Sequence, residues 1–290
     1  MAQERAHVTV LFQEVIAYLA PRASGHYIDA TLGAGGHAAG ILEASAPTGR
    51  LLGLDADPAA LAIAGANLAA FGDRATLVHS NFERLGEVAA ANDFIPADGI
   101  VFDLGLSSMQ LADAARGFSF QSDGALNMRF NPDDPTTAAD LVNSLDEEEL
   151  ADVIYEYGEE HASRPIARAI VRARPIRTAS QLARVIESAV GRHGKIHPAT
   201  RTFQALRIEV NREIEVLQKV LPQISEILGP HGKVAIISFH SLEDRLVKNW
   251  FRASESLSVL TKHPVRPTHD ETVLNPRSRS AKLRVAEKVA

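Results

Sequence analysis

The chain has 290 residues, of which 46% are hydrophobic, and its formal net charge is -6. This length suits one large domain, or one domain that carries a smaller one. The sequence contains no cysteine, which excludes disulfides, thiolate metal sites and a cysteine nucleophile. No apolar run approaches the ~20 residues that a membrane span needs, and residues 1–7 lack the pattern of a signal peptide. We therefore expect a soluble cytoplasmic protein.

The first elements of the chain predict a cradle for a nucleotide. Apolar spacing indicates an amphipathic helix over residues 8–19. Residues 27–31 indicate a buried strand, residues 33–36 a glycine turn, and residues 38–44 a helix whose first amides point back at the turn. Asp55 closes a second strand about twenty residues after the glycines, where an acidic side chain accepts hydrogen bonds from both ribose hydroxyls.

The glycines alone leave two interpretations open. They fit the pattern G-x-G-x-x-A only loosely, and an ordinary turn followed by a surface aspartate explains them equally well. The strand before the turn, the helix after it and the position of Asp55 together favour nucleoside binding.

Three aspartates accompany the predicted strands. Asp29 lies in the first strand, Asp55 ends the second, and Asp103 follows a fourth strand over residues 99–102. Because ligands of open α/β sheets bind at the carboxyl ends of the strands, we expect these side chains along one edge. Unpaired carboxylates on one rim are costly unless a cation or a group rich in donors binds there. Two ribose hydroxyls, an amino group and a sulfonium would serve.

The intervening segment contains a further helix and strand. Asp57 is expected to cap a helix that begins at Pro58. A third strand over residues 75–78 leads to Phe82, which either stacks on an adenine or packs in the core.

The α/β pattern stops near residue 112, and a helical block follows. Residues 116–135 indicate an ordered loop or lid. No strand is predicted in this block, and its helices are expected at residues 136–157 (one or two helices), 165–174 and 178–190.

The α/β pattern resumes after this block. A long helix is expected over residues 202–228, with a kink at Pro222. The remaining elements are a fifth core strand, a helix and a closing antiparallel pair, at residues 233–239, 241–251, and 258–261 with 282–289. We therefore expect a core domain of residues 1–112 and 202–290 and a helical insertion of residues 113–201.

The charges are unevenly distributed along the chain. Residues 143–160 carry eight acids and no Lys or Arg, whereas residues 161–213 carry eleven bases against three acids. Residues 262–290 carry seven bases against three acids. A single charged residue usually lies on a solvated helix face. A segment such as residues 161–213, with a net charge of +8 inside an acidic protein, predicts an interaction surface.

The order of elements resembles a class I S-adenosylmethionine-dependent methyltransferase, an α/β fold with a mostly parallel Rossmann-like sheet and a C-terminal antiparallel hairpin. A nicotinamide dehydrogenase would usually carry a second mononucleotide half in place of that hairpin. The expected fold is therefore this class with an inserted helical domain.

Five segments together resemble one bacterial family, the ribosomal small-subunit RNA (cytosine-N4)-methyltransferases (RsmH/MraW), over essentially the whole chain. The segments are HVTVL at 7–11, YIDATLGAGGH at 27–37, DLGLSS at 103–108 with Gln110, SFHSLED at 238–244 and NPRSRSAKLR at 275–284. The resemblance implies methylation of the exocyclic amine of one cytidine in 16S rRNA, at the decoding site, with S-adenosyl-L-methionine as the cofactor. The implied partner is 16S rRNA or the small ribosomal subunit.

The resemblance also implies the residues that contact the cofactor. The backbone at Gly35, Gly36 and His37 would let the methionine end approach closely, and Asp55 would take the ribose. Asp103 and Gln110 would lie on the substrate side, and Phe82 would hold the adenine. His37 has no second ligand at a suitable spacing, so we expect no metal.

The resemblance implies one candidate catalytic group. Cytosine N4 is a poor nucleophile because its lone pair is delocalised into the ring, and an acceptor for its hydrogens would draw that pair back. Asp103 is the candidate acceptor, unless it belongs wholly to the cofactor. Related DNA methyltransferases carry Asp/Asn-Pro-Pro-Tyr/Phe at this place, but residues 103–106 here have neither proline nor an aromatic ring. The stacking partner must come from elsewhere, and the candidates are Phe118, Phe120 and Tyr155.

The basic insertion is then the expected RNA-facing surface, with Arg164, Arg168 and Arg172 four apart on one side of a helix and a second contact from residues 277–284. The oligomeric state, monomer or homodimer, stays open. Three other functions also stay open: a DNA or small-molecule amino-methyltransferase, a dinucleotide-dependent oxidoreductase, and a non-catalytic RNA-binding assembly factor.

Overall fold

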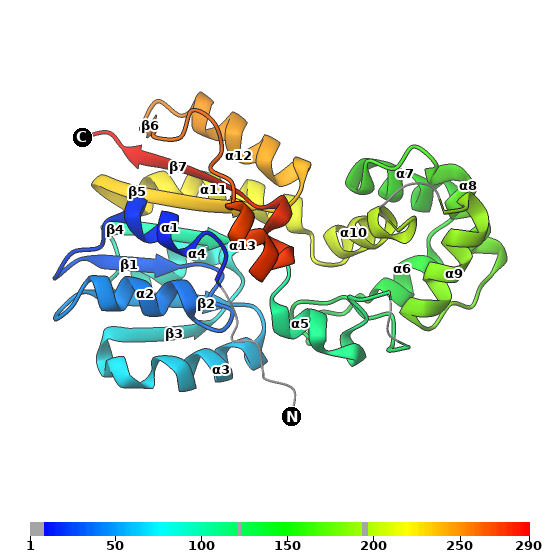
Figure 1. Ribbon diagram of the computed structural model, residues 1–290, viewed down its shortest axis with the longest axis horizontal. Coiled ribbons are helices and arrows are strands. Elements are labelled where there is room, and N and C mark those ends of the chain that lie inside the picture. The colour runs from blue at the N-terminus through cyan, green and yellow to red at the C-terminus, as the bar shows by residue number, and fades with distance from the viewer. Residues whose placement is uncertain (1–8, 121–122, 193–196) are drawn as a thin grey trace. The chain divides into compact units, whose positions relative to one another are not determined.

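The computed structural model describes residues 9–120, 123–192 and 197–290 (Figure 1). His7 and Val8 of the expected N-terminal motif, and Lys195 of the basic block, lie outside the described residues. The chain forms two compact units. The sheet unit comprises the residues up to Gly105 together with Ile214–Ala290, and the helical unit comprises Leu106–Glu213.

The division differs in detail from the expected domains, because the helical unit extends on both sides of residues 113–201. Its additional N-terminal part includes the short helix α5 (Ser108–Ala112). Its additional C-terminal part is most of the helix α10 (Ala199–Val210), whose Phe203 and Leu206 are buried in the core of this unit.

The sheet unit is built on seven strands in the order β3-β2-β1-β4-β5-β7-β6. The first five in this order are parallel, and β7 is antiparallel to both of its neighbours, β5 and β6, which confirms the expected sheet with its C-terminal hairpin. The strands are β1 (His26–Asp29), β2 (Arg50–Asp55), β3 (Ala75–His79), β4 (Ala97–Asp103), β5 (Leu228–Ser238), β6 (Leu257–Val259) and β7 (Lys282–Lys288).

Helices cover both faces of this sheet, so its central strands are continuous apolar runs rather than alternating ones. On one face lie α1 (Phe12–Leu19), α2 (Gly36–Ala44) and α3 (Pro58–Leu68). On the other lie α4 (Leu85–Ala91), α11 (Glu213–Ile227) and α12 (Ser241–Ala253). Adjacent residues of β5 pack on opposite faces, since Ile236 lies in the core with α4, α11 and α12, and Ile237 in the core with α1, α2 and α3. Asp57 caps α3 ahead of Pro58, as expected.

The first helix is shorter than the expected span of residues 8–19. It begins at Phe12 because Leu11 takes a left-handed conformation with φ of 51°. The amide of Leu11 donates to Oε1 of Glu271, on the short helix α13 (His269–Leu274), at 2.8 Å. A contact made by a residue so distant in sequence sets this boundary, so local spacing could not predict it.

The helical unit has one apolar core of its own. Besides α5 and α10, its helices are α6 (Ala138–Ser144), α7 (Glu147–Gly158), α8 (Ser163–Arg172) and α9 (Ala179–Val190). Leu150, Ile170 and Ile186 show how α7, α8 and α9 pack, since each is fully buried in this core. The loop before α6 is held by Arg116, which donates to the carbonyls of Arg129 and Phe130 at 2.7 and 2.9 Å.

The single helix expected over residues 202–228 is wrong. The structure has α10 and α11 instead, with a break at Asn211 and Arg212, where Arg212 has φ of 50°. The side chain of Asn211 donates to the carbonyl of Met128 at 2.8 Å and accepts from the amide of Phe130. These hydrogen bonds replace helix continuation, whereas Pro222, the expected kink, lies inside α11.

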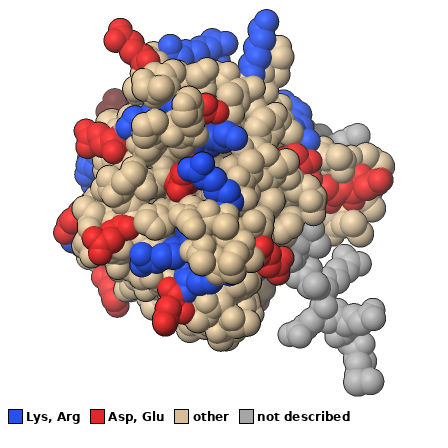
Figure 2. Space-filling model, turned by 90° about the vertical axis from the view of Figure 1, so that its left-hand side faces the viewer, with Lys and Arg blue, Asp and Glu red and all other residues tan. Residues whose placement is uncertain are grey.

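Two further features of the described chain concern its helices and its surface charges. No helix in the described part of the chain is long and apolar enough to span a membrane. On the face shown in Figure 2, basic and acidic side chains are interspersed rather than gathered by sign.

Candidate active site at the carboxyl edge of the sheet

The expected edge of aspartates is present in the sheet unit. Asp29, Asp55 and Asp103 are the last residues of β1, β2 and β4. Since these strands are parallel, their carboxyl ends share one edge. The chain runs outward from β1 through β2 to β3 on one side and from β4 to β5 on the other, so the switch point lies between Asp29 and Asp103. Open α/β sheets bind their ligands at such a point.

The glycine turn brings bare backbone to this edge. Gly33 and Gly35 have φ of 53° and 85°, which favour glycine. Gly36 is required for space instead, because a Cβ there would lie 2.0 Å from Oγ1 of Thr9. Gly35 caps α2 without a side chain that could accept from its first amides. The first amides of α2 therefore depend on other acceptors, and the amide of Ala38 donates to Asp29.

Asp55 is tied to this turn. Its Oδ2 accepts from the amide of Gly33 at 2.8 Å, and its Oδ1 accepts from the amide of Asp57 at 2.9 Å. Burial raises the pKa of Asp55 above its ordinary value, and the two amide hydrogen bonds oppose that rise. Each carboxylate oxygen has a second lone pair, so the side chain can still accept from a ligand hydroxyl.

Asp29 and Asp103 face a less polar environment. Asp29 is 1% exposed, and burial, only partly offset by the amide of Thr31, raises its pKa to about 7. The side chain of Asp103 is 25% exposed, but its Oδ1 is buried and has no hydrogen-bond partner within the described part of the chain. Burial and the charges of Asp29 and Glu243 raise the pKa of Asp103 to about 8. A ligand that brings a donor or a positive charge would satisfy this oxygen.

His37 lies beside Asp103 in the sheet unit. Its Nε2 contacts the carbonyl of Val10 at 3.0 Å, and its Nδ1 lies 3.8 Å from Oδ2 of Asp103. The ring is 4% exposed and stacks on Phe12. The imidazole thus packs inside the unit, while the backbone of α2 at His37 faces the turn.

Phe82 and Gln110 have packing roles in the structure. Phe82 is partly buried and meets Phe102 edge to face, with ring centroids 5.6 Å apart. Gln110 belongs to the helical unit, where its side chain and that of Ser107 form the capping box of α5 at 3.1 Å in both directions. Neither contact tests the expected role at the cofactor, so both roles stay predictions.

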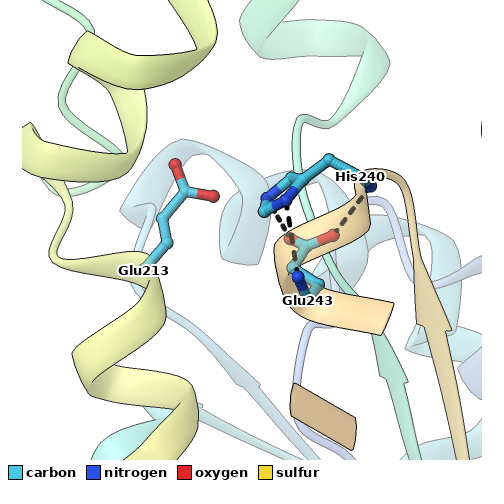
Figure 3. Close-up of side chains that lie close together, drawn as sticks. All are labelled: Glu213, His240 and Glu243. Carbon is cyan, nitrogen blue, oxygen red and sulfur yellow. Dashed lines mark hydrogen bonds and ion pairs between the residues drawn. The ribbon is translucent and has the colours of Figure 1, made fainter. Parts of the chain in front are cut away.

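A buried His–Glu pair stands close to the edge, and sequence reasoning assigned it no role. His240 is the N-cap of α12, and Glu243 closes the capping box. Nδ1 of His240 accepts from the amide of Glu243, so the proton of the neutral ring lies on Nε2, 3.1 Å from Oε1 of Glu243 (Figure 3). Oε2 of Glu243 accepts from the amide of Phe239 at 2.8 Å. The usual capping box begins with Ser, Thr, Asp or Asn, so the pattern H-x-x-E carried no such signal in the sequence.

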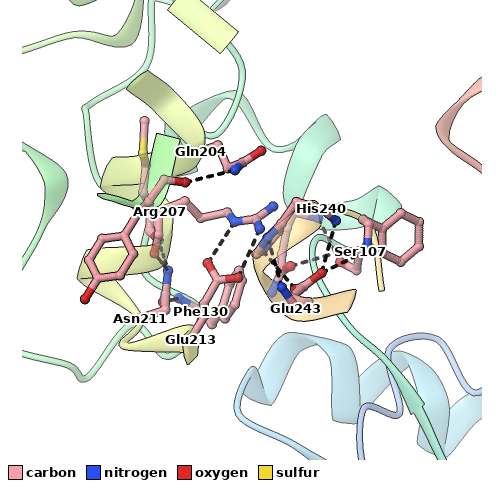
Figure 4. A network of polar contacts seen from close by, with 12 residues as sticks. Ser107, Phe130, Gln204, Arg207, Asn211, Glu213, His240 and Glu243 are labelled. Carbon is pink, nitrogen blue, oxygen red and sulfur yellow. Dashed lines mark hydrogen bonds and ion pairs between the residues drawn. The ribbon is translucent and has the colours of Figure 1, made fainter. Parts of the chain in front are cut away.

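The expected basic surface is only partly available. Arg207 donates to both oxygens of Glu213 at 2.8 and 3.0 Å (Figure 4), and Arg174 donates to the carbonyls at the end of α6. Arg168 pairs with Glu147 at 3.1 Å. The arginines of α8 and α9 that stay exposed and form no ion pair in the described part of the chain are Arg164, Arg172 and Arg184.

A groove runs between α8 and α9 beside these arginines. Its volume is about 400 Å³, and its walls are the small apolar side chains of both helices with three polar ones. The lining residues are Ala169, Ala173, Gln181, Arg184, Val185, Ser188 and Ala189.

Comparison with known proteins agrees with this fold. The chain is 47% identical to the ribosomal RNA small subunit methyltransferase H of Dehalococcoides mccartyi, over 99% of this chain and 87% of that protein. It is 50% identical to the protein of the same name from Thermomicrobium roseum (98% of this chain, 94% of that protein) and 51% identical to that from Trichormus variabilis (98% and 92%). The solved structure of PH0851 is 9% identical over 97% of this chain and 47% of that chain, with a TM-score of 0.51, a likeness of fold alone. The model of the MraW methylase family matches residues 4–289, and the chain belongs to that family.

Proposed function

We propose that this protein transfers a methyl group from S-adenosyl-L-methionine to N4 of one cytidine in 16S rRNA, at the decoding site of the small ribosomal subunit. The proposal is supported by membership of the methylase family and by full-length relatives named ribosomal RNA small subunit methyltransferase H. The choice of N4, and of the decoding site, rests on the resemblance of the five sequence segments. We place the reaction in the cytoplasm, where ribosomal subunits are found.

The observation that carries the proposal in the structure is the unpaired oxygen of Asp103 beside the glycine turn. S-adenosylmethionine, when bound, supplies an activated methyl group on a cationic sulfur. A ligand with a ribose diol, an amino group and a positive charge fits an edge that holds the carboxyl groups of Asp29, Asp55 and Asp103, whose pKa values burial raises. The residues that would hold it are Gly35, Gly36 and Asp55, with Asp29 and Asp103 at the same edge of the sheet.

The chain's own residues have three tasks in this reaction. Gly36 keeps the glycine turn packed against Thr9, because a Cβ there would lie 2.0 Å from Oγ1 of Thr9. Asp55 accepts from the ribose and so orients the donor. Oδ1 of Asp103 can accept a hydrogen bond from the target amine, which draws the amine lone pair back onto nitrogen and helps the proton to leave.

The helical unit is the proposed RNA-binding surface. Arg164, Arg172 and Arg184 are exposed on α8 and α9, and Arg184 lines the groove between these helices. Arginines that are not already paired within the protein are the ones that can neutralise phosphates. RNA must also present the cytidine unstacked, because its amine is not reachable inside a helix.

Two assays test the proposal. Labelled S-adenosylmethionine is offered with 16S rRNA, assembled small subunits and DNA in parallel, and label is expected only in the RNA or the subunit. Nucleoside mass spectrometry of 16S rRNA from cells with and without the gene then identifies the modified base. Label in DNA alone, or a methyl group on an atom other than cytosine N4, would contradict the proposed substrate.

A further inference from the structure

Asp29 and Asp103 are joined at the switch point by one residue. The amide of Thr31 donates to Oδ1 of Asp29 at 3.1 Å, and the hydroxyl of Thr31 accepts from the amide of Asp103 at 2.6 Å. The strands that carry them are paired, with Asp29 opposite Val101. Thr31 therefore holds the carboxyl group of Asp29 and the backbone of Asp103 at adjacent strand ends.

The charges around this pair are mainly negative. The negative charge of Asp55, on β2, raises the pKa of Asp29, and that of Glu243, on α12, raises the pKa of Asp103. Nδ1 of His37, on α2, lies 3.8 Å from Oδ2 of Asp103. The ring of His240 contacts Glu243 instead, with Nε2 3.1 Å from Oε1.

Neither Asp29 nor Asp103 forms an ion pair with a Lys or Arg in the described part of the chain. Two desolvated carboxyl groups of this kind cannot both be ionised cheaply without a cation.

We propose that Asp29 and Asp103 act as a charge-sensing pair that keeps a proton in the free protein, releases it when the sulfonium of S-adenosylmethionine binds, and thereby distinguishes that donor from the neutral thioether product. The inference rests on the proposed function, which supplies the ligand. S-adenosylhomocysteine has the same adenine, ribose, amino and carboxylate groups as the donor but no charge on sulfur. It therefore stabilises the ionised form of the pair less than the donor does. The pair binds a proton again once the methyl group has been transferred.

Because proton release is linked to ligand binding, the affinity for the donor should depend on pH. For each proton released on binding, the affinity rises about tenfold per pH unit. The window lies below about pH 8, because the pKa of Asp29 is raised to about 7 and that of Asp103 to about 8. Between about pH 6 and 7 we expect the affinity for S-adenosylmethionine to rise about tenfold, and that for S-adenosylhomocysteine to rise by less than about threefold. Above about pH 8.5 both affinities should level off.

Titration calorimetry on the full chain tests the pair. S-adenosylmethionine and S-adenosylhomocysteine are each titrated near pH 7 in phosphate and in Tris, whose ionisation enthalpies differ, so the heat difference counts the protons released. We expect about one proton for the donor and clearly less for the product. Sinefungin, which carries a charged amine in place of the methylsulfonium, should behave like the donor.

The variant Asp103→Asn should abolish the difference in proton release between the two ligands. The exposed Asp73→Asn is the matched control and should keep the difference. Equal proton release for donor and product, or none for the donor, overturns the charge-sensing pair even if both bind. Absence of any donor binding by the unaltered protein would instead remove the proposed function, and the inference with it. The comparison of ligands on the unaltered chain decides the matter even if Asp103→Asn does not fold.

Discussion

The amide of Gly33 donates to Oδ2 of Asp55 at 2.8 Å, so one hydrogen bond fastens the turn after β1 to the end of β2. The other oxygen of Asp55 accepts from the amide of Asp57, at the start of α3. The carboxylate proposed to bind the ribose therefore also holds the cradle in shape. Its contributions to binding and to structure can be separated by substitution.

Asp55→Ala should weaken binding of S-adenosylmethionine by roughly ten- to a hundredfold, the scale of a lost charged hydrogen bond of about 1.5–3 kcal/mol. Asp55→Asn should lose less, because the amide oxygen still accepts one of the two backbone hydrogen bonds. Calorimetry on both variants, with Asp73→Asn as the surface control, measures the difference. Unchanged affinity in Asp55→Ala would show that this residue is not the ribose ligand.

Gly36→Ala should reduce stability by about 1–3 kcal/mol, the usual range for overpacking, and should also weaken cofactor binding. The reason is space, since the added Cβ meets Oγ1 of Thr9 at 2.0 Å, and Cβ of Thr9 at 3.2 Å. The double variant Thr9→Ala with Gly36→Ala should regain most of the loss, because it removes the hydroxyl and leaves only the longer contact. Urea unfolding of Gly36→Ala, of Thr9→Ala alone and of the double variant checks this, and a double variant as unstable as Gly36→Ala would refute the steric explanation.

Replacing Arg164, Arg172 and Arg184 by Gln should weaken RNA binding and flatten its salt dependence. Each lost phosphate contact should lower the slope of log affinity against log salt by about 0.7 for single-stranded RNA. Filter binding to a fragment of 16S rRNA across a salt series measures the slope, and cofactor affinity should not change.

A charge-matched control keeps that experiment specific to the helical unit. The exposed cations Arg22, Arg84 and Lys219 lie on the sheet unit and already pair with acids there. Their replacement by Gln should leave the slope unaltered. Equal slopes for the first triple variant and the unaltered protein would place the RNA surface elsewhere, and residues 277–284 would be the next region to test.

The stability of the ligand-free protein should fall as pH rises from about 4 to about 8, and level off above that. The folded-state pKa of Asp29 and that of Asp103 lie above the ordinary value, so between about pH 4 and 8 the unfolded chain binds fewer protons than the folded chain. Each such group can lower stability by up to about 1.4 kcal/mol per pH unit inside its window. Thermal unfolding of the unaltered protein and of Asp103→Asn across this range measures the effect. The variant should have a flatter profile, and an identical profile would mean that Asp103 does not hold a proton.

Local patterns were enough to predict much of the sheet unit. The apolar runs around Leu51 and Ile236 mark buried parallel strands, and the Asp57-Pro58 pair marks the start of α3. These signals are short-range, because burial on both faces and the capping of a helix depend on neighbouring residues. The acidic edge followed from the rule that parallel strands end together.

Other features depend on contacts between residues far apart in sequence. Charge counting placed Arg174 and Arg207 in an interaction surface, yet one caps α6 and the other pairs with Glu213. The break at Arg212 depends on a loop some eighty residues earlier, which Asn211 holds. No periodicity in α10 or α11 carries that information.

By itself the sequence determined the order of strands and helices, the glycine turn, the aspartates at the strand ends and the family. Only the tertiary structure decided which of those groups are buried, paired or left with an open lone pair. Asp29 and Asp103 are ordinary aspartates in the sequence. Their raised pKa values arise because folding removes water from both and sets further carboxylates beside them, and desolvation of this kind depends on the whole packed unit rather than on any local segment.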